Sequence, residues 1–303
     1  MVSGPLFGNV PVPFPDETSY SLLCRYSVRR GQLTSSHLCI ELFGHTQPLS
    51  GYIFKPFKTK DLEKWYSGEV PEGLEFGSRH SCYPYYAMFL GPVHAERVRA
   101  CRIGSSMTAG QAKRINRECG FARSHKKNLW YCPECVREDF ARKGETCWRR
   151  LPQMPGATYC PVHEIRFRES NVCFEDIDYQ LIPATYALLH LPERVMGNAN
   201  VYSDRYFLLS KDIAWLLKNG FMVADNESIR QSFIAASGKP VREHLFCMTA
   251  KAQSRENRFE DYLAGRIMTD SGKNRITEQT SRQLGTILSI EESYGSLEAF
   301  FGA

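Results

Sequence analysis

The spacing of apolar and polar residues predicts a mainly α-helical chain that begins with two short helices. From residue 18 to residue 30, apolar side chains recur at helical intervals and a glycine follows, so an amphipathic helix is expected there. A second helix is expected from Ser36 to Phe43, with a cap from Thr34 or Ser35 and an end at Gly44. Such a pair forms either a helix-turn-helix that reads a DNA groove or an ordinary helical hairpin. The second helix has almost no basic residues, which favours the hairpin.

Helical spacing continues along most of the remaining chain. The clearest later segment runs from Lys211 to Lys218, where Ser210 is the expected N-cap and Gly220 the expected end. The stretch from Tyr83 to Pro92 is the most aromatic, and rings so closely spaced are expected in a core rather than in stacking on unpaired bases. Further helices are expected at 59–66, 94–103, 108–119, 136–143, 227–236, 240–248, 258–269 and 281–301.

The changes in pattern divide the chain into three predicted regions. A length of 303 residues is enough for two or three modules. We expect an N-terminal helical region at 1–95, basic helices with a zinc-finger module at 96–170, and a C-terminal helical domain at 171–303.

Two cysteine-containing corners in the central region predict a metal site. Cys132 and Cys135 are separated by a Pro-Glu pair, and Cys160 and His163 by a Pro-Val pair, with 24 residues between the corners. Three thiolates and one imidazole match the ligand number and softness of a closed tetrahedral zinc site. A two-residue gap lets both ends of a tight turn reach one ion, and the proline restricts the turn before metal binds. The sequence therefore predicts one structural Zn²⁺.

Other interpretations of these residues are less favourable. A thioredoxin-type redox pair at Cys132 and Cys135 would need a βαβ context, which the basic loop and short charged helix around it do not indicate. Simple buried thiols remain an alternative. A hydrolytic zinc enzyme is disfavoured, because four protein ligands leave no open position and no paired carboxylates or Ser/His group is found. A second metal site is also disfavoured by the spacing of the remaining candidates, Cys101, Cys119, Cys147, Cys173 and the His80/Cys82 pair.

Cysteine usage and hydropathy bear on localisation. The eleven cysteines are odd in number and spread over the whole chain, which indicates a reducing cytoplasm rather than a disulfide framework. The first 15 residues have no basic start and no apolar segment, so no signal peptide is expected. No stretch approaches the roughly 20 apolar residues of a membrane helix, so no membrane association is expected.

Positive charge is concentrated next to the predicted zinc site. The net charge is only +5, but residues 97–150 contain 14 Lys or Arg against 5 Asp or Glu. Such a surplus suits the neutralisation of DNA phosphates, although a solvated helix face, or cations placed at a helix C-terminus, would also explain it. The candidate DNA-binding residues are Lys113, Arg114, Arg117, Arg123, Lys126, Lys127, Arg149 and Arg150.

Several motifs resemble the TniQ/TnsD family of transposon target-selection proteins. Residues 13–26, with a Phe-Pro pair followed by Glu and Ser-Leu, are similar to the first helix of that family. One departure is Pro152, where many relatives carry His before the Gln. The resemblance also rests on Trp130–Val136, Gly144, Trp148–Arg150, Gln153–Gly156 and Cys160–His163, and it continues more loosely to Phe301.

The resemblance implies a bacterial, nucleoid-associated adaptor without enzymatic activity. Family members bind double-stranded DNA at an attachment site, or dock on an RNA-guided effector complex without reading DNA bases, and recruit an AAA+ ATPase. By matching positions, Cys132, Cys135, Cys160 and His163 would be the zinc ligands. TnsD-like members are usually longer at the C-terminus, so the chain is expected to be either truncated or a short form.

Overall fold

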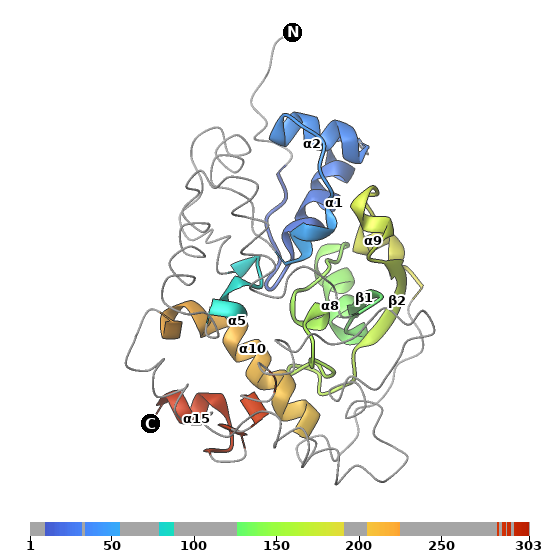
Figure 1. The fold of residues 1–303 in the computed structure, drawn as a ribbon. Helices are drawn as coiled ribbons and strands as arrows, with labels where there is room; N and C mark the ends of the chain where they lie inside the picture. The colour runs from blue at the N-terminus through green and yellow to red at the C-terminus, as the bar shows by residue number, and fades with distance from the viewer. Residues whose placement is uncertain are drawn as a thin grey trace.

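A computed structural model describes the central region with the two cysteine corners and the elements around it. The described residues are 10–31, 34–54, 79–87, 126–190, 205–224, 284, 287–288, 290–291 and 294–302. The fold is rich in helices and has one small two-stranded sheet, which confirms the mainly α class (Figure 1). The helices expected at 59–66, 94–103, 108–119, 227–236, 240–248 and 258–269 lie outside the described residues.

The two N-terminal helices form as predicted, but the first is much more buried than expected. Helix α1 (Ser19–Arg29) is capped by Thr18, whose hydroxyl accepts from the amide of Ser21. Helix α2 (Ser35–Phe43) is capped by Thr34 and ends at Gly44, which has φ 77°. Every residue of α1 from 19 to 27 is buried, so its polar positions face other parts of the protein instead of solvent.

The two helices also contact each other. The Tyr26 hydroxyl donates to Glu41 Oε1 at 2.9 Å, across the turn between them. This contact is compatible with a hairpin and with a helix-turn-helix.

The central module contains two antiparallel strands and the helix that follows the first of them. Strand β1 (Asn128–Tyr131) pairs antiparallel with β2 (Arg168–Cys173), with Trp130 opposite Glu169. Helix α8 (Pro133–Lys143) lies between the strands in sequence and begins one turn earlier than the predicted Val136. It ends at Gly144 as predicted, with φ 70°. Short elements complete this part of the chain: η2 (Ser50–Ile53), η3 (Leu151–Gln153), η4 (Asp176–Asp178) and α9 (Ala184–Ala187).

Helix α10 corrects the prediction for the C-terminal part. It spans Arg205–Ala224, so Ser210 is inside the helix and is not its N-cap, and Gly220 does not end it. The Ser210 hydroxyl donates to the carbonyl of Tyr206 at 2.7 Å and accepts from the amide of Thr158 at 3.0 Å. The hydroxyl therefore links α10 to the segment before Cys160. This tertiary contact accounts for the serine at position 210, which the local sequence pattern assigned to an N-cap.

Two shorter helices lie against α10. Helix α5 (Tyr83–Ala87) packs on it, and the tyrosines at 83, 85 and 86 are buried, consistent with the core interpretation of this aromatic stretch. Helix α15 (Leu297–Gly302) is the last element. The amide of Leu297 donates to both carboxylate oxygens of Asp212 on α10, at 3.2 and 3.1 Å.

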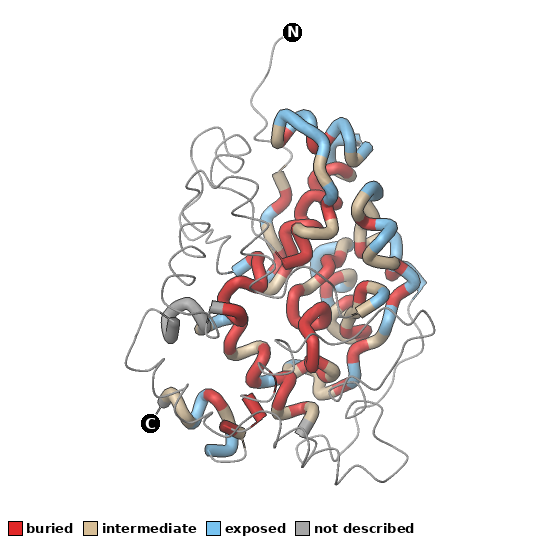
Figure 2. Tube along the Cα trace, in the orientation of Figure 1, coloured by how far each residue is buried: buried red, intermediate tan, exposed pale blue. Residues whose placement is uncertain are grey.

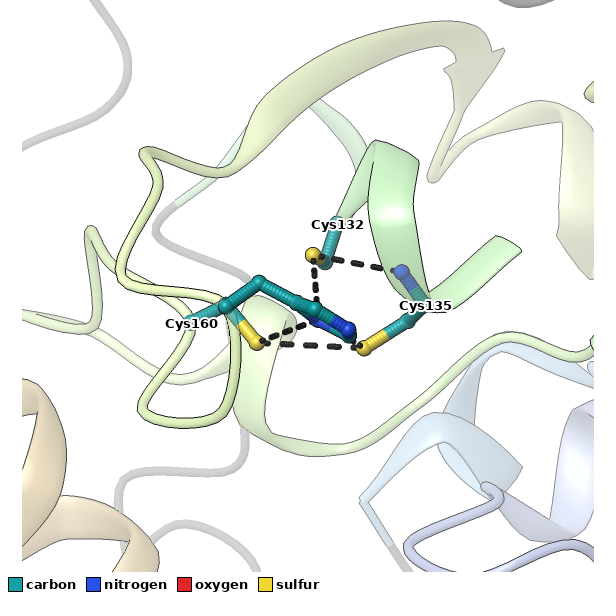
Figure 3. A group of neighbouring side chains, drawn as sticks. Cys132, Cys135 and Cys160 are labelled. Atoms are coloured by element: carbon teal, nitrogen blue, oxygen red, sulfur yellow. Dashed lines mark hydrogen bonds between the residues drawn. The ribbon is translucent and has the colours of Figure 1, made fainter. Parts of the chain in front are cut away.

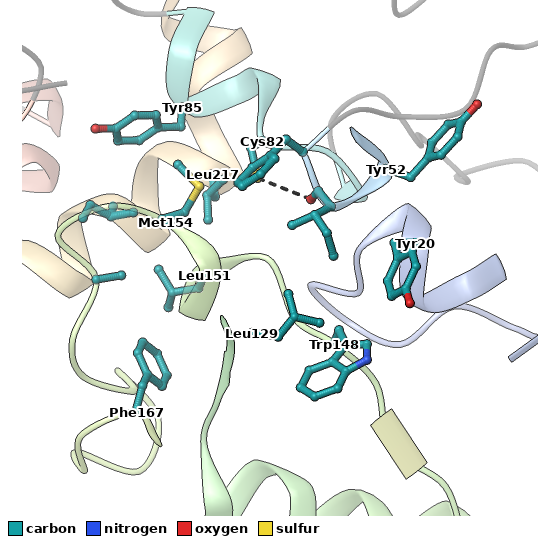
Figure 4. Packing of buried hydrophobic residues seen from close by; sticks show 14 of the residues in the cluster. Tyr20, Tyr52, Cys82, Tyr85, Leu129, Trp148, Leu151, Met154, Phe167 and Leu217 are labelled. Carbon is teal, nitrogen blue, oxygen red and sulfur yellow. Dashed lines mark hydrogen bonds between the residues drawn. The ribbon is translucent and has the colours of Figure 1, made fainter. Parts of the chain in front are cut away.

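One hydrophobic cluster runs through residues from all three predicted regions (Figure 2). Trp148 is fully buried in it, and its indole Nε1 donates to the carbonyl of Ile182 at 2.9 Å. Tyr20 from α1 and Leu129 from β1 lie beside Trp148, and Leu217 from α10 lies near Met154 in another part of the same cluster (Figure 4). The region boundaries at 95 and 170 remain a prediction. Within the described residues, no helix has the length and hydropathy needed to cross a membrane.

Candidate metal centre

The first cysteine corner forms where strand β1 passes into helix α8. Cys132 is the N-cap residue, and its Sγ accepts from the amide of Cys135 at 3.5 Å. Pro133 occupies the first helical position, where its missing N–H is not needed. The partial positive charge at a helix N-terminus stabilises thiolates, so this position favours sulfurs that lose their protons when a cation binds.

The second corner is the tip of a narrow hairpin. Tyr159 and Arg166 form an antiparallel bridge, and the amide of Cys160 donates to the carbonyl of Ile165 at 2.9 Å. The chain turns back at Glu164, whose φ is 58° and whose amide donates to the carbonyl of Cys160 at 2.8 Å. The backbone therefore fixes Cys160 and the next residues in a tight turn before any metal binds.

The two corners bring all four predicted ligands together. Their ligand atoms lie within 4.8 Å of one another (Figure 3). Cys135 Sγ is 3.8 Å from Cys160 Sγ, and His163 Nδ1 lies 3.3–3.5 Å from the three sulfurs. A zinc tetrahedron with Zn–S of about 2.3 Å and Zn–N of about 2.0–2.1 Å has S···S edges of about 3.8 Å and S···N edges of about 3.6 Å. The donor set and its spacing thus fit Zn²⁺.

A carboxylate orients the histidine of this group. His163 directs Nδ1 to the sulfurs, and its Nε2 lies 3.0 Å from Glu138 Oε1 on helix α8. Burial lowers the pKa of His163, but the hydrogen bonds to Glu138 and Cys160 outweigh it and raise this pKa overall. Zinc-ligating histidines commonly donate their second N–H to a carboxylate, which fixes the tautomer and the ring orientation. The sequence pattern did not identify Glu138, because nothing in its spacing marks it.

The sulfurs also influence one another. Hydrogen bonds from the thiols of Cys132 and Cys135 lower the pKa of Cys160. A cluster of three close sulfurs favours a bound cation, because thiolates repel one another without a charge between them.

Buried polar contacts attach the N-terminal segment to the zinc module. Arg150 Nε pairs with Asp16 Oδ1 at 2.7 Å, and the amides of Arg150 and Leu151 donate to the carbonyl and the carboxylate of Asp16. The amide of Thr18 donates to the carbonyl of Trp148 at 2.9 Å. Two residues of the tryptophan motif therefore bind the segment that precedes helix α1.

A fully buried glutamate strengthens this attachment. Glu17 Oε2 pairs with Arg25 Nη1 at 2.7 Å, and Arg25 Nη2 pairs with Glu145 at 2.6 Å. Burial raises the pKa of Glu17, although the guanidinium of Arg25 opposes that shift. His80, which sequence analysis considered only as a possible metal ligand, has its Nδ1 2.9 Å from the carbonyl of Glu17. We call Asp16, Glu17, Arg25, His80 and Arg150 the N-terminal clamp.

The Gln-x-Pro-Gly turn has two structural roles. Gln153 accepts from the amide of Trp130 at 3.0 Å and donates to its carbonyl at 2.8 Å, so its side chain pairs with strand β1 like a neighbouring strand. Gly156 has φ 80°, and a Cβ there would lie 2.8 Å from Leu284 Cδ2 and 3.3 Å from Ile213 Cδ1. Glycine is therefore required both by the backbone conformation and by the close approach of α10.

Three of the candidate DNA-binding residues have partners inside the protein. Arg149 forms a two-pronged ion pair with Asp139, at 2.8 and 2.9 Å, and Arg150 belongs to the clamp. Lys126 Nζ donates to the carbonyls of Pro152 and Ala157 at 2.5 and 2.9 Å. Burial lowers the pKa of this ammonium to about 7. These contacts explain the three cations without DNA.

The other candidates differ in position. Lys127 is exposed, beside the first corner. Lys113, Arg114, Arg117 and Arg123 lie outside the described residues.

Among the described residues, the four ligands form the only group of three or more metal-binding side chains. Cys82 instead lies with its thiol 3.9 Å from the carbonyl of Ile53, and burial raises its pKa. Cys147 is buried, Cys173 is half-buried, and Cys101 and Cys119 lie outside the described residues.

Comparisons with known proteins agree with the sequence motifs. The model of the TniQ family matches residues 9–167, which include both corners and the N-terminal clamp. The transposon Tn7 transposition protein TnsD of Escherichia coli is 28% identical over 167 residues. This match covers 51% of the chain and 30% of TnsD, so it spans less than a third of that relative.

Proposed function

Because the chain belongs to the TniQ family, we propose that it selects target sites for transposition as a DNA-binding adaptor. In this proposal it binds double-stranded DNA at an attachment site and recruits an AAA+ ATPase regulator to that site. The similarity to TnsD, a transposition protein, supports a role in transposition. The closed metal centre supports an adaptor rather than an enzyme.

The geometry of the metal centre carries this proposal. Four protein side chains converge within 4.8 Å, which completes the shell of a tetrahedral ion and leaves no position for a substrate or a reactive water. A bound zinc ion would supply a cross-link between the two corners. The chain's own residues then orient the ligands, through Glu138, and attach the N-terminal helices, through the clamp.

The proposed DNA contacts follow from exposure and charge. Of the four described candidates, Lys127 presents its side chain to solvent, while Lys126, Arg149 and Arg150 are engaged within the protein. We therefore retain Lys127 for phosphate contact, together with Lys113, Arg114, Arg117 and Arg123 from the basic region of the sequence.

DNA binding can be tested with the zinc-loaded full chain and labelled attachment-site DNA. We expect affinity to fall steeply with salt, because each phosphate contact releases a counterion. Alanine at the five retained positions is expected to weaken binding to all sequences about equally and to reduce the slope by about 0.9 per lost contact. Lys211→Ala, which removes an exposed lysine on α10, is the matched control.

The absence of any binding at low salt would contradict the DNA-binding role. It would favour the other adaptor mode, in which the protein docks on an RNA-guided effector complex and does not read DNA. Recruitment is measured separately, by co-sedimentation of the AAA+ ATPase with the chain in the presence and absence of DNA.

A further inference from the structure

A groove beside the metal centre has no role in the contacts described so far. Its volume is about 750 Å³, and it lies between the extended segment before α1, both cysteine corners with their four predicted ligands, and helix α10. Apolar residues form much of its wall, among them Val12, Phe14, Val162 and Leu217. Val12 and Val162 are 75% and 76% exposed, unusually high values for apolar side chains that line a concave surface.

Charge at the groove is unevenly distributed. Its lining contains five cationic side chains and two carboxylates, and a zinc ion with three thiolates would add one negative charge. Most of these groups are paired with one another: Arg150 with Asp16, and Arg142 with Glu138. Arg79 and Lys218 are exposed and have no ion pair within the described part of the chain. The rim therefore carries a positive surplus above apolar walls.

This combination indicates the chemistry of the occupant. Duplex DNA would place phosphates against apolar walls that cannot solvate them. A small polar ligand would need convergent polar groups on the floor, but Asp16, Arg149 and His163 are already hydrogen-bonded within the protein. A short extended peptide meets both conditions, because its apolar side chains can enter the groove while flanking carboxylates reach the rim.

We propose that this groove binds an extended segment of a partner protein in which apolar residues are flanked by Asp or Glu. The inference deepens the recruitment part of the proposed function and rests on it. It places the docking site on the zinc module, so the same metal that holds the module together also shapes the partner-binding surface.

The probe is a library of random twelve-residue peptides displayed on phage, selected on the zinc-loaded full chain. Selected peptides are expected to combine Leu, Ile, Val or Pro with Asp or Glu and to bind with micromolar affinity. Val12→Asp is expected to weaken the selected peptides by about tenfold or more, because it adds a repelling charge to an apolar contact. Val162→Asp should have the same effect. Because Val162 is next to the predicted ligand His163 in sequence and Val12 is not, Val12→Asp separates peptide binding from an effect on zinc.

Helix α10 offers a matched pair for the charge. Lys218→Glu is expected to weaken acidic peptides by about three- to tenfold and to reduce the dependence of binding on salt. Lys211→Glu, two turns earlier and outside the groove lining, should change affinity by less than about twofold. Zinc content and far-UV circular dichroism confirm that each variant is folded.

Three results would overturn the proposal: selected peptides without acidic residues, affinities that Val12→Asp and Val162→Asp leave unchanged, or displacement of the peptides by duplex DNA. Attachment-site binding is measured on the same variants. If the chain without substitutions does not bind attachment-site DNA, the proposed function is contradicted. The peptide measurements do not use DNA, so the two failures can be told apart.

Discussion

The metal centre and the N-terminal clamp hold the same module by opposite means. The centre uses four ligands from two local turns, and its strength is set by one ion. The clamp uses ion pairs of buried side chains, such as the guanidinium of Arg25 with Glu17 and that of Arg150 with the distant Asp16. Burial of charge is costly unless the partner is present, so the clamp is sensitive to the loss of one member. A bound metal would join the two corners of the module, while the clamp attaches the first helix to it.

Removal of the metal is expected to have the largest effect. Chelation of zinc, or Cys160→Ser, should unfold residues around both corners, with a loss on the order of 10 kcal/mol of metal-binding free energy. Thermal unfolding by circular dichroism and zinc stoichiometry measure this. Cys173→Ser, at a half-buried cysteine outside the ligand set, is the control and should retain one zinc. A chain that keeps its melting temperature after full chelation would contradict the role of the metal.

Removal of one clamp charge is expected to come second. Glu17→Gln leaves the buried guanidinium of Arg25 without its fully buried partner and should destabilise the protein by roughly 3–5 kcal/mol. Denaturant unfolding gives the magnitude, and zinc content should remain at one per chain. The matched variant Arg29→Gln, on the exposed end of α1, should cost well under about 1 kcal/mol. Loss of zinc in Glu17→Gln would show that the metal centre depends on the N-terminal clamp.

A substitution at Gly156 tests the contact of the module with Leu284 and with helix α10. Gly156→Ala places a Cβ 2.8 Å from Leu284 Cδ2 and forces a positive φ on a residue with a side chain, so a loss of about 1–3 kcal/mol is expected. Gly144→Ala has a similar φ but open space around it, and it should cost about 1 kcal/mol. Equal losses in urea unfolding would show that the close packing of Leu284 and α10 against Gly156 contributes nothing.

The smallest effect concerns pH at the clamp. Burial lowers the pKa of His80 to about 4, below its ordinary value of 6.5. The unfolded chain therefore binds the proton first, so this contribution to stability is complete above about pH 6.5 and is lost as pH falls towards 4. At pH 5.5 the loss should be about 1 kcal/mol. His80→Gln should show a correspondingly weaker pH dependence in this window, and an unchanged slope would exclude His80 as its source.

Local signals made the metal centre and several helix ends predictable. The two corners need only turn-length spacing, and all four predicted ligands converge. Caps such as Thr34 and stops such as Gly44 act within one turn of their helices, so sequence neighbours suffice to predict them. The family motifs were likewise readable, although the sequence did not reveal that Trp148–Arg150 serves to hold the first helix.

Long-range burial explains where the predictions failed. Serine is a residue type typical of helix N-caps, but Ser210 bonds to residues more than 50 positions away and lies inside a longer helix. The DNA-binding role of Lys126, Arg149 and Arg150 stays a prediction, but the sequence did not indicate that each of these cations has partners inside the protein. Glu138 also escaped notice, because its importance depends on a histidine from the other corner.

The sequence by itself determined which four side chains could bind a metal and where the first helices begin and end, since these features depend on neighbours within one or two turns. Only the tertiary structure decided which charges face solvent, that residues 19–27 of α1 are buried, and that a groove opens beside the cysteine corners. The physical reason is desolvation: whether a charge is free or paired depends on segments that meet from distant parts of the chain.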